Sequence, residues 1–460
     1  MHIIKQGILA LCTTLVAAQI SSADTLNDIY ESALRSDPVL SAARATFNAE
    51  REIKNISRGA LLPQLALSGD YTESETNDDT RSIIVINDNL VNSGAAGVID
   101  SQATSYGVSL TQALFDMPSW YRFKSGNALS KSAQAQFAAD QQSLIIRVSE
   151  AYFNVLRAYD NLQTRSAEER AIERQLEQTR ERFEVGLLPV TDVHEAQAVF
   201  DDAAVNSLEA HGALNIAFEG LQVLTGQNHI SLAGLNDSFE AINPQPLNSQ
   251  DWVDFAIANN YQLKVAKLGA DAAYNSAKAA AAARLPKITG RASYFDSDSD
   301  GTRYSAPFES QQDGHSFVIS VTMPIWMGGS VDAQRRQAKQ RSIASNQSYT
   351  AIRRNVIQSS RSLHQLVMTN TARVKARKQS ITSADSALQA TQAGYEVGTR
   401  NIVDVMVAQR SLYQARRSYA NARYDYILSM MRLKEVAGQL SPEDIIRLNA
   451  RLDPQLAIAK

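Results

Sequence analysis

The chain has 460 residues and is nearly balanced in charge, with 45 lysines and arginines against 48 aspartates and glutamates. A nucleic-acid binder would carry a basic excess, so this balance speaks against that class of protein. Only 21 glycines and 11 prolines occur, little more than half the usual share, and so few helix breakers favour long helices. No run of 18 apolar residues follows the N-terminus, which argues against a membrane protein built of helices.

Residues 1–23 have the pattern of a secretory signal peptide. Lys5 precedes a mostly apolar run at 7–18 that is too short to cross a bilayer, and small residues then lead up to Asp24. Lipid attachment at Cys12 is the weaker alternative, because a leucine precedes it where a small residue is expected. Cys12 is the only cysteine, so a mature chain that begins at Asp24 has neither disulfides nor a thiolate metal site.

The sequence contains an internal duplication. Four short segments of the first half recur in the second half at one common separation of 212 residues: 183–186 at 395–398, 190–193 at 402–405, 196–197 at 408–409, and 224–226 at 436–438. A fifth pair, 62–65 and 285–288, is separated by 223 residues, so the first half is slightly longer. A tandem duplication decides the architecture, because each half should then fold in the same way.

Each half has the same predicted plan of one shorter helix, two strands and two long helices. The first repeat is placed at 24–226 and the second at 261–438, joined by a linker at 227–260 that we expect to be irregular because of its prolines, and followed by a tail at 439–460. The shorter helices are expected at 38–61 and 262–283, the strands at about 64–74, 104–115, 287–296 and 315–325, and the long helices at about 119–185, 191–224, 330–397 and 401–436.

The long segments and the short alternating ones predict different structures. Within 119–185, apolar residues recur every three or four positions, which predicts a helix about 100 Å long. On periodicity alone, a solvent-exposed coiled coil is an equal alternative. The four strands alternate apolar and polar residues over about ten positions, which is the length of a tilted transmembrane strand. An amphipathic hairpin that covers a soluble core is the alternative there.

Export and strand number together favour a membrane barrel. The polar segments 73–101 and 296–314 are expected as long loops that join the strands of each pair. Four strands cannot close a barrel, and lipid does not tolerate an open sheet edge, so the chain must oligomerise if its strands span a membrane. Three copies would supply about twelve strands, enough for a water-filled lumen, and the long helices would form a tube at one end.

Several motifs are specific enough to compare with known families. They are LLPQL at 61–65, LTQALFD at 110–116, AYFNVL at 151–156, RFEVGL at 182–187 and YEVGTRNIVDV at 395–405. With these motifs the chain resembles the TolC family of outer-membrane channel-tunnels, from about Asp24 to Leu440. The resemblance implies a mixed fold, with a twelve-stranded transmembrane β-barrel and a long α-helical barrel across the periplasm. Each of three identical chains would contribute four strands and two long helical hairpins.

The resemblance also implies a function, an exit channel in the bacterial outer membrane without enzymatic activity or cofactor. Its partners would be outer-membrane lipid, a periplasmic adaptor (membrane fusion) protein and an inner-membrane transporter, either an ABC protein or a proton-driven one, and no nucleic acid. The cargo stays open, because type I protein secretion and multidrug efflux use the same conduit. A periplasmic coiled-coil adaptor or structural protein without a barrel is the alternative, although an adaptor would need one hairpin and a compact β-domain.

One acidic residue near the second hairpin turn is a candidate for the channel entrance. By its motif position, the resemblance assigns Asp404 to a ring of acidic side chains around an entrance that is closed at rest. Val407 stands where the family has a second entrance acid, so a single ring is expected. The alternative is that Asn401 and Asp404, spaced like a capping box, merely stabilise a helix start, and the same alternative holds for Asp192.

A second set of residues is expected to hold that entrance closed. By the same resemblance, Tyr395 and Arg400 form a gate latch with Asp192 and Thr191 of neighbouring helices. The glycines expected at the two helix-hairpin turns are Gly186 and Gly398.

The sequence does not favour an enzyme. The five histidines after the predicted signal peptide form no H-E-x-x-H pair, and neither a Gly-rich phosphate loop nor a nucleophile elbow occurs. We therefore expect neither a catalytic nor a metal site.

Overall fold

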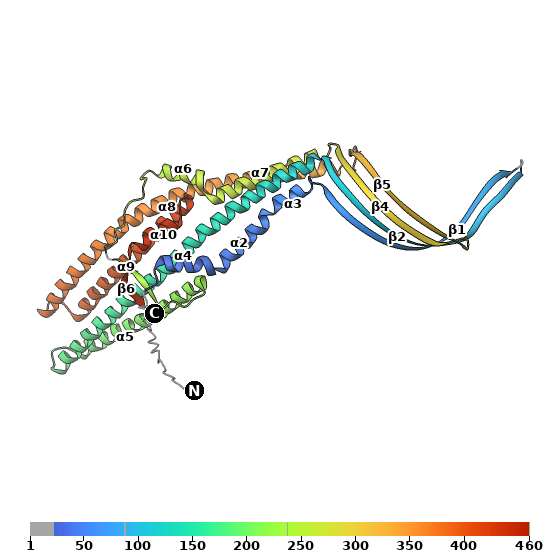
Figure 1. Ribbon diagram of the computed structural model, residues 1–460. Helices are drawn as coiled ribbons and strands as arrows, with labels where there is room; N and C mark the ends of the chain where they lie inside the picture. Colours follow the sequence, from blue (N-terminus) through green and yellow to red (C-terminus); the bar gives the residue numbers. More distant parts are fainter. Residues whose placement is uncertain (1–22, 87–88, 237, 460) are drawn as a thin grey trace, which may run out of the picture. The chain divides into compact units, whose positions relative to one another are not determined.

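The computed structural model describes residues 23–86, 89–236 and 238–459 (Figure 1). The predicted signal peptide, apart from Ala23, lies outside the described residues. Internal contacts divide the chain into two compact units, which are described separately. The strand unit comprises Ala43–Ala139 and Asn260–Val356, and the hairpin unit comprises Met1–Ala42, Asp140–Asn259 and Ile357–Lys460. Among the described residues, no helix combines the length and the apolar character needed to cross a membrane.

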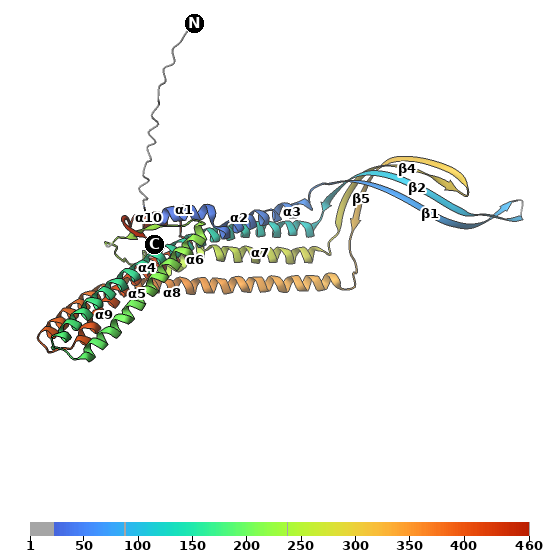
Figure 2. The same ribbon diagram turned by 90° about the horizontal axis from the view of Figure 1, so that it is seen from below.

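The strand unit is built around an antiparallel sheet of four strands. They are β1 (Gln64–Ile86), β2 (Asn89–Phe115), β4 (Lys287–Arg303) and β5 (Ala306–Thr322), in the spatial order β1-β2-β4-β5. The hairpins of the two repeats therefore pair through β2 and β4, and β1 and β5 form the edges. Figure 2 shows the strands curving away from the ends of α3 (Ile53–Gly59) and α7 (Tyr261–Ala282).

Near the start of β1 and the end of β2, one face of the sheet is apolar across all four strands. The register places Leu65 opposite Leu110, Leu110 opposite Ala292, and Ala292 opposite Phe317. Leu67, two residues along β1, points to the same face. Leu67 and Phe317 are 79% and 72% exposed. An apolar surface of this extent is unfavourable in water, whereas outer-membrane strands present such a face to lipid.

The segments predicted as polar loops are strands instead. β1 and β2 stay paired from Glu73 with Gln102 as far as Ile86 with Asn89, and β4 and β5 stay paired through 296–314. The loop prediction was wrong because residues of any polarity can be extended and hydrogen-bonded to a neighbouring strand. Polar side chains indicate only that their surroundings are polar. The turn between β4 and β5 has two residues, Tyr304 and Ser305, both with positive φ, as in a type I′ hairpin.

The hairpin unit contains the parts of two long helical hairpins that include both turns. α4 (Met117–Glu184) precedes α5 (Val190–Thr225), and α8 (Ser330–Glu396) precedes α9 (Ile402–Val436). α4 and α8 begin in the strand unit. Within the hairpin unit the helices follow the order α8, α9, α4, α5 (Figure 1). Buried aromatic rings connect α4 and α9, with the Phe153 centroid 5.9 Å from that of Tyr424 and 5.6 Å from that of Tyr152.

The linker and the tail are more regular than predicted. β3 (Ser231–Leu235) pairs antiparallel with β6 (Leu452–Ala459). The same two regions form α6 (Ser249–Asn259) and α10 (Pro442–Asn449). A ladder between segments so far apart in sequence leaves no local signal, so the prediction of an irregular linker was wrong. The hydroxyl of Tyr152 on α4 donates to the carbonyl oxygen of Ala233 at 2.7 Å, which connects this small sheet to the long helices.

A buried carboxylate fixes the N-terminal helices. Asp37 lies between α1 (Leu26–Ser36) and α2 (Pro38–Arg51), and it is only 2% exposed. Arg147 donates to its two oxygens at 3.1 and 2.6 Å, and the Leu40 amide donates to it at 2.8 Å. Burial opposes the charge of Asp37, but these donors hold its pKa below the ordinary value. The Asp37 carboxylate is therefore charged at neutral pH.

Candidate functional site

The two hairpin turns have the same backbone structure. After α4, Gly186 has φ +77°, and the Leu187 amide donates to the Arg182 carbonyl at 2.9 Å. After α8, Gly398 has φ +74°, and the equivalent bond, from Thr399, measures 2.8 Å. Such bonds close the last helical turn when a residue with positive φ follows it, a conformation that only glycine adopts without strain. The turn glycines thus have a backbone role in both repeats.

Asp404 lies in the first turn of α9. Its backbone amide donates to the side-chain oxygen of Asn401 at 2.8 Å, so Asn401 caps the helix. The Asp404 carboxylate takes no part in that cap. It is 40% exposed and lies 3.7 Å from the guanidinium of Arg400, which is 61% exposed. An ion pair this exposed contributes little to stability, so the structure gives the Asp404 carboxylate no strong structural role within one chain.

The predicted latch residues of the first repeat lie at the start of α5. The Thr191 hydroxyl donates to the Asp192 carboxylate at 3.3 Å. The N-cap residue of α5 is Pro189, whose ring has no atom that can accept a hydrogen bond. Within one chain the structure brings Arg400 to Asp404 and Thr191 to Asp192. None of the hydrogen bonds or ion pairs described for this protomer joins Tyr395 or Arg400 to Thr191 or Asp192.

Tyr395 is partly buried near the second turn. It packs against two small apolar clusters, one that includes Leu176 and Ile402 and one that includes Leu388. The guanidinium carbon of Arg182 lies 5.0 Å from the centroid of the Tyr395 ring, which is within the range of a cation–π contact. The Tyr395 hydroxyl is buried and has no hydrogen-bond partner in the described part of the protomer. Sequence reasoning did not identify Arg182, although it directly precedes the repeated motif at 183–186.

Away from the turns, four charged or polar pairs join α4 to α9. The pairs are Glu150 with Arg432 at 2.5 Å, Arg157 with Asp425 at 2.8 Å, Asp160 with Tyr424 at 2.6 Å, and Glu168 with Arg417 at 2.6 Å. The α4 partner advances along its helix while the α9 partner recedes, as antiparallel helices require. We call these four pairs the α4–α9 ladder. The sequence analysis missed it, because the pairing appears only when the two helices are aligned.

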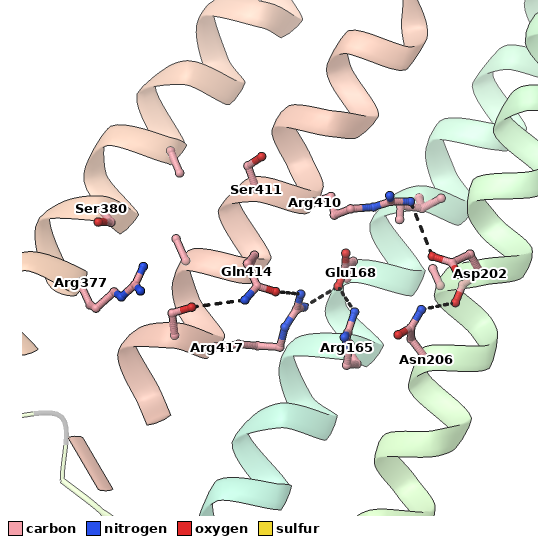
Figure 3. A pocket seen from close by; sticks show the side chains of 15 residues that line it. Arg165, Glu168, Asp202, Asn206, Arg377, Ser380, Arg410, Ser411, Gln414 and Arg417 are labelled. Atoms are coloured by element: carbon pink, nitrogen blue, oxygen red, sulfur yellow. Dashed lines mark hydrogen bonds and ion pairs between the residues drawn. The ribbon is translucent and has the colours of Figure 1, made fainter. Parts of the chain in front are cut away.

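The pair of the α4–α9 ladder formed by Glu168 and Arg417 borders a polar pocket. The pocket has a volume of about 680 Å³ and is lined by residues of α4, α5, α8 and α9 (Figure 3). Glu168, 4% exposed, accepts from both Arg417 at 2.6 Å and Arg165 at 3.4 Å. Burial lowers the pKa of Arg417, and the adjacent carboxylate opposes that shift. At the pocket edge, Arg410 lies 3.7 Å from Asp202 of α5.

Comparison with known proteins gives consistent similarities. The sequence model of the family described as outer membrane efflux protein matches residues 29–227 and 252–439. The outer membrane protein TolC of Vibrio cholerae is 35% identical over 434 residues, which cover 94% of each chain. The alkaline protease secretion protein AprF of Pseudomonas aeruginosa is 28% identical over 91% of this chain and 85% of its own.

The same architecture occurs in solved structures. The outer membrane protein VceC of Vibrio cholerae aligns with a TM-score of 0.73 at 20% sequence identity, covering 90% of this chain and 96% of VceC. At this identity the similarity concerns the fold, in which a protomer contributes four strands and long helical hairpins.

The buried rung at Glu168 should be the most sensitive part of the ladder. Glu168→Gln removes the charge that two arginines share, and breaking a buried pair in this way costs about 3–5 kcal/mol. Thermal unfolding of the helices, followed by circular dichroism, measures the loss. Glu150→Gln is the matched control at the exposed end, where Arg432 is 54% exposed, and it should cost less than about 1 kcal/mol. Equal losses in the two variants would contradict the assignment.

Proposed function

Because the chain belongs to the outer membrane efflux protein family, we propose that three copies of it form one exit channel that works with a periplasmic adaptor and an inner-membrane transporter. The protein is an outer-membrane efflux channel of the TolC family and a transport protein, not an enzyme. The alternative of a periplasmic adaptor is wrong, because the family match covers both repeats of the chain.

The proposal that several copies assemble rests on the two edges of the sheet. β1 and β5 each pair on one side only within the described sheet. In lipid, each unsatisfied backbone group costs several kcal/mol, so strands span a membrane only as a closed barrel. An edge formed by β5 of one copy and β1 of the next repeats around a ring and leaves no free edge. Three copies give about twelve strands, which enclose more space than their side chains fill.

The helical hairpins and the relatives support the proposed partners. The hairpin unit ends in two turns, and exposed charged residues, Arg400 and Asp404, lie at one of them. We assign the entrance for cargo to this end, where a transporter and an adaptor would deliver it. AprF carries the name of a protease secretion protein, which supports protein export as one task of this channel. Efflux of small compounds would use the same lumen.

We assign the gate to residues at the turns. In the assembled channel, three Asp404 carboxylates would surround one axis and attract cations by their summed potential. The Tyr395 hydroxyl, which is buried without a partner in the described protomer, needs an acceptor, and the Asp192 carboxylate would supply it. Arg400 would bond to Thr191 and Asp192. Such bonds hold the entrance closed, because each charged hydrogen bond contributes about 1.5–3 kcal/mol.

Arginine at neighbouring positions of β1 should have opposite consequences for membrane insertion. Leu67 belongs to the apolar face, and Ser68 points to the other face. On the lipid side an arginine costs about 2–4 kcal/mol at mid-depth, and every copy bears that cost. Leu67→Arg should therefore deplete the protein from the outer-membrane fraction, whereas Ser68→Arg should still insert. Immunoblots of separated membranes give the measurement, and equal insertion of both variants would refute the assigned faces.

Loss of the latch should open the channel. The double variant Arg400→Ser with Tyr395→Phe removes both proposed partners of Thr191 and Asp192 in every copy. We expect a higher single-channel conductance in planar lipid bilayers. Arg410→Ser is the control, because Arg410 pairs with Asp202 inside the protomer, and its conductance should stay near that of the parent. A double variant with unchanged conductance would count against the latch.

Neutralising Asp404 should reduce the preference of the channel for cations. Asp404→Asn keeps the helix cap, since Asn401 bonds to the backbone of residue 404. It should lower cation selectivity and weaken block by divalent cations without preventing assembly. Reversal potentials in salt gradients measure the selectivity. Asp385→Asn, the same change on α8 away from the turn, serves as the control. If both variants behave alike, Asp404 does not form the ring.

A further inference from the structure

We propose that an apolar pocket in the hairpin unit binds a small organic acid, with Arg451 holding the carboxylate and the pocket covering a compact apolar body. The pocket lies between α9, α10 and the linker segment 239–242, and its volume is about 400 Å³. It shares no lining residue with the polar pocket beside Glu168. The inference concerns a single chain and goes beyond the channel function proposed above.

Most of the pocket surface is apolar. α9 contributes the buried side chains of Ile427 and Met431, and also Met430. Leu448 of α10 and Ile242 of the linker complete the apolar lining. Pockets of this size that are lined mainly by hydrophobic side chains, with a few polar groups at fixed positions, are typical sites for small molecules. Methionine side chains adapt readily to the shape of a bound apolar group.

The linker side of the pocket is held in place by α9. The hydroxyl of Tyr426 donates to the carbonyl oxygen of Ile242 at 2.7 Å and accepts from the Ile242 amide at 3.2 Å. The ring centroids of Phe239 and Tyr426 lie 5.9 Å apart, and both buried rings line the pocket. Because this wall is already ordered, a ligand would lose little binding energy to ordering it.

The α10 side of the pocket is held by an ion pair. The Lys434 ammonium of α9 lies 2.6 Å from the carboxylate of Asp444, which is buried. The other oxygen of Asp444 accepts from the Ser441 amide at 3.1 Å. Lys434 and Asp444 therefore compensate each other, and neither charge is left for a ligand.

Arg451 is a cation at this pocket that lacks such a partner. Its side chain is exposed, and none of the ion pairs or side-chain hydrogen bonds found among the described residues includes it. Its backbone is fixed, because its amide donates to the Leu448 carbonyl at 2.9 Å and its carbonyl accepts from the Asn236 amide at 3.1 Å. Burial raises the pKa of Tyr426, and the bond to Ile242 and the charge of Arg451 oppose that shift. The positive charge of Arg451 therefore acts on the pocket wall.

The other charges at the pocket favour an anionic ligand. The lining contains three cationic side chains and two carboxylates, so one positive charge is not compensated. Arg447 lies 3.5 Å from Glu443, which is outside the lining. Glu240 also lines a neighbouring pocket with Lys375 and Lys378 of α8, so positive charges lie on that side of it. Arg451 is thus the side chain best placed to bind a ligand carboxylate.

A carboxylate joined to a compact apolar body fits both features of the pocket. The planar guanidinium of an arginine can donate two parallel hydrogen bonds to one carboxylate. The apolar body would leave water for the surface formed by Met430, Leu448 and Ile242. An aromatic body would also meet the rings of Phe239 and Tyr426 in edge-to-face or offset contact.

A matched pair of ligands tests the role of the charge. The probes are 2-naphthylacetate and its neutral analogue 2-naphthylethanol, titrated by calorimetry into the whole protein in lipid nanodiscs. Empty nanodiscs, titrated in the same way, correct for partitioning into lipid. We expect saturable binding of 2-naphthylacetate, and binding of the alcohol weaker by about tenfold or more, because it cannot form a charged hydrogen bond with Arg451.

Two variants and one control locate the site. Arg451→Gln should weaken the binding of 2-naphthylacetate by about tenfold and leave the binding of the alcohol nearly unchanged. Ile242→Glu introduces a negative charge at a side chain that is 62% exposed, so the fold is kept, and it should weaken the acid more than the alcohol. Arg416→Gln is the control, because this exposed arginine of α9 lies outside the pocket lining. Circular dichroism checks that each variant is folded.

The outcomes decide the inference without reference to the channel. A loss of affinity in Arg451→Gln that is specific to the acid, with Arg416→Gln like the parent, supports the site. A parent protein without saturable binding, or with equal affinity for the acid and the alcohol, overturns it. An Arg451→Gln variant that binds the acid as tightly as Arg416→Gln does also overturns it. Each of these negative results leaves the proposed exit channel intact.

Discussion

The central constraint on this protein is that its sheet has two edges and an exposed apolar band that crosses all four strands on one face. The backbone groups along the outer sides of β1 and β5 need hydrogen-bond partners, and Leu67 and Phe317 need apolar surroundings. Water satisfies the edges but not the face, and lipid satisfies the face but not the edges. Closure with further copies, as proposed above, would satisfy both, and the two hairpins that the duplication provides in each chain would then form part of one closed barrel.

The long helices divide into a fixed part and a part that can shift. Between α4 and α9, the ladder includes the buried pair of Glu168 and Arg417, and a sliding movement there would leave charges without partners at high cost. Near the turns, the contacts are small apolar clusters and the exposed pair of Arg400 and Asp404. Such contacts are weaker and less directional. The gate proposed at the turns would therefore move while the register of the ladder is kept.

Much of the fold could be predicted because its signals are local. Period-two alternation located the four strands, and glycine in the repeated motif located the hairpin turns with positive φ. The extended strands were missed because polar residues such as those at 73–101 do not show whether their backbone is paired. The pairing of β3 with β6, the contact of Arg182 with Tyr395 and the rung from Glu168 to Arg417 connect residues far apart in sequence. A single sequence does not show which of these distant segments lie next to each other in the folded chain.

The most direct measurement is the mass of the protein released from its native outer membrane in intact lipid particles, recorded by native mass spectrometry. Closure of open sheets by further copies predicts one species that contains three chains, with no single chain retained in lipid. A stable particle with one chain, its β1 and β5 edges unpaired in lipid, would contradict the account.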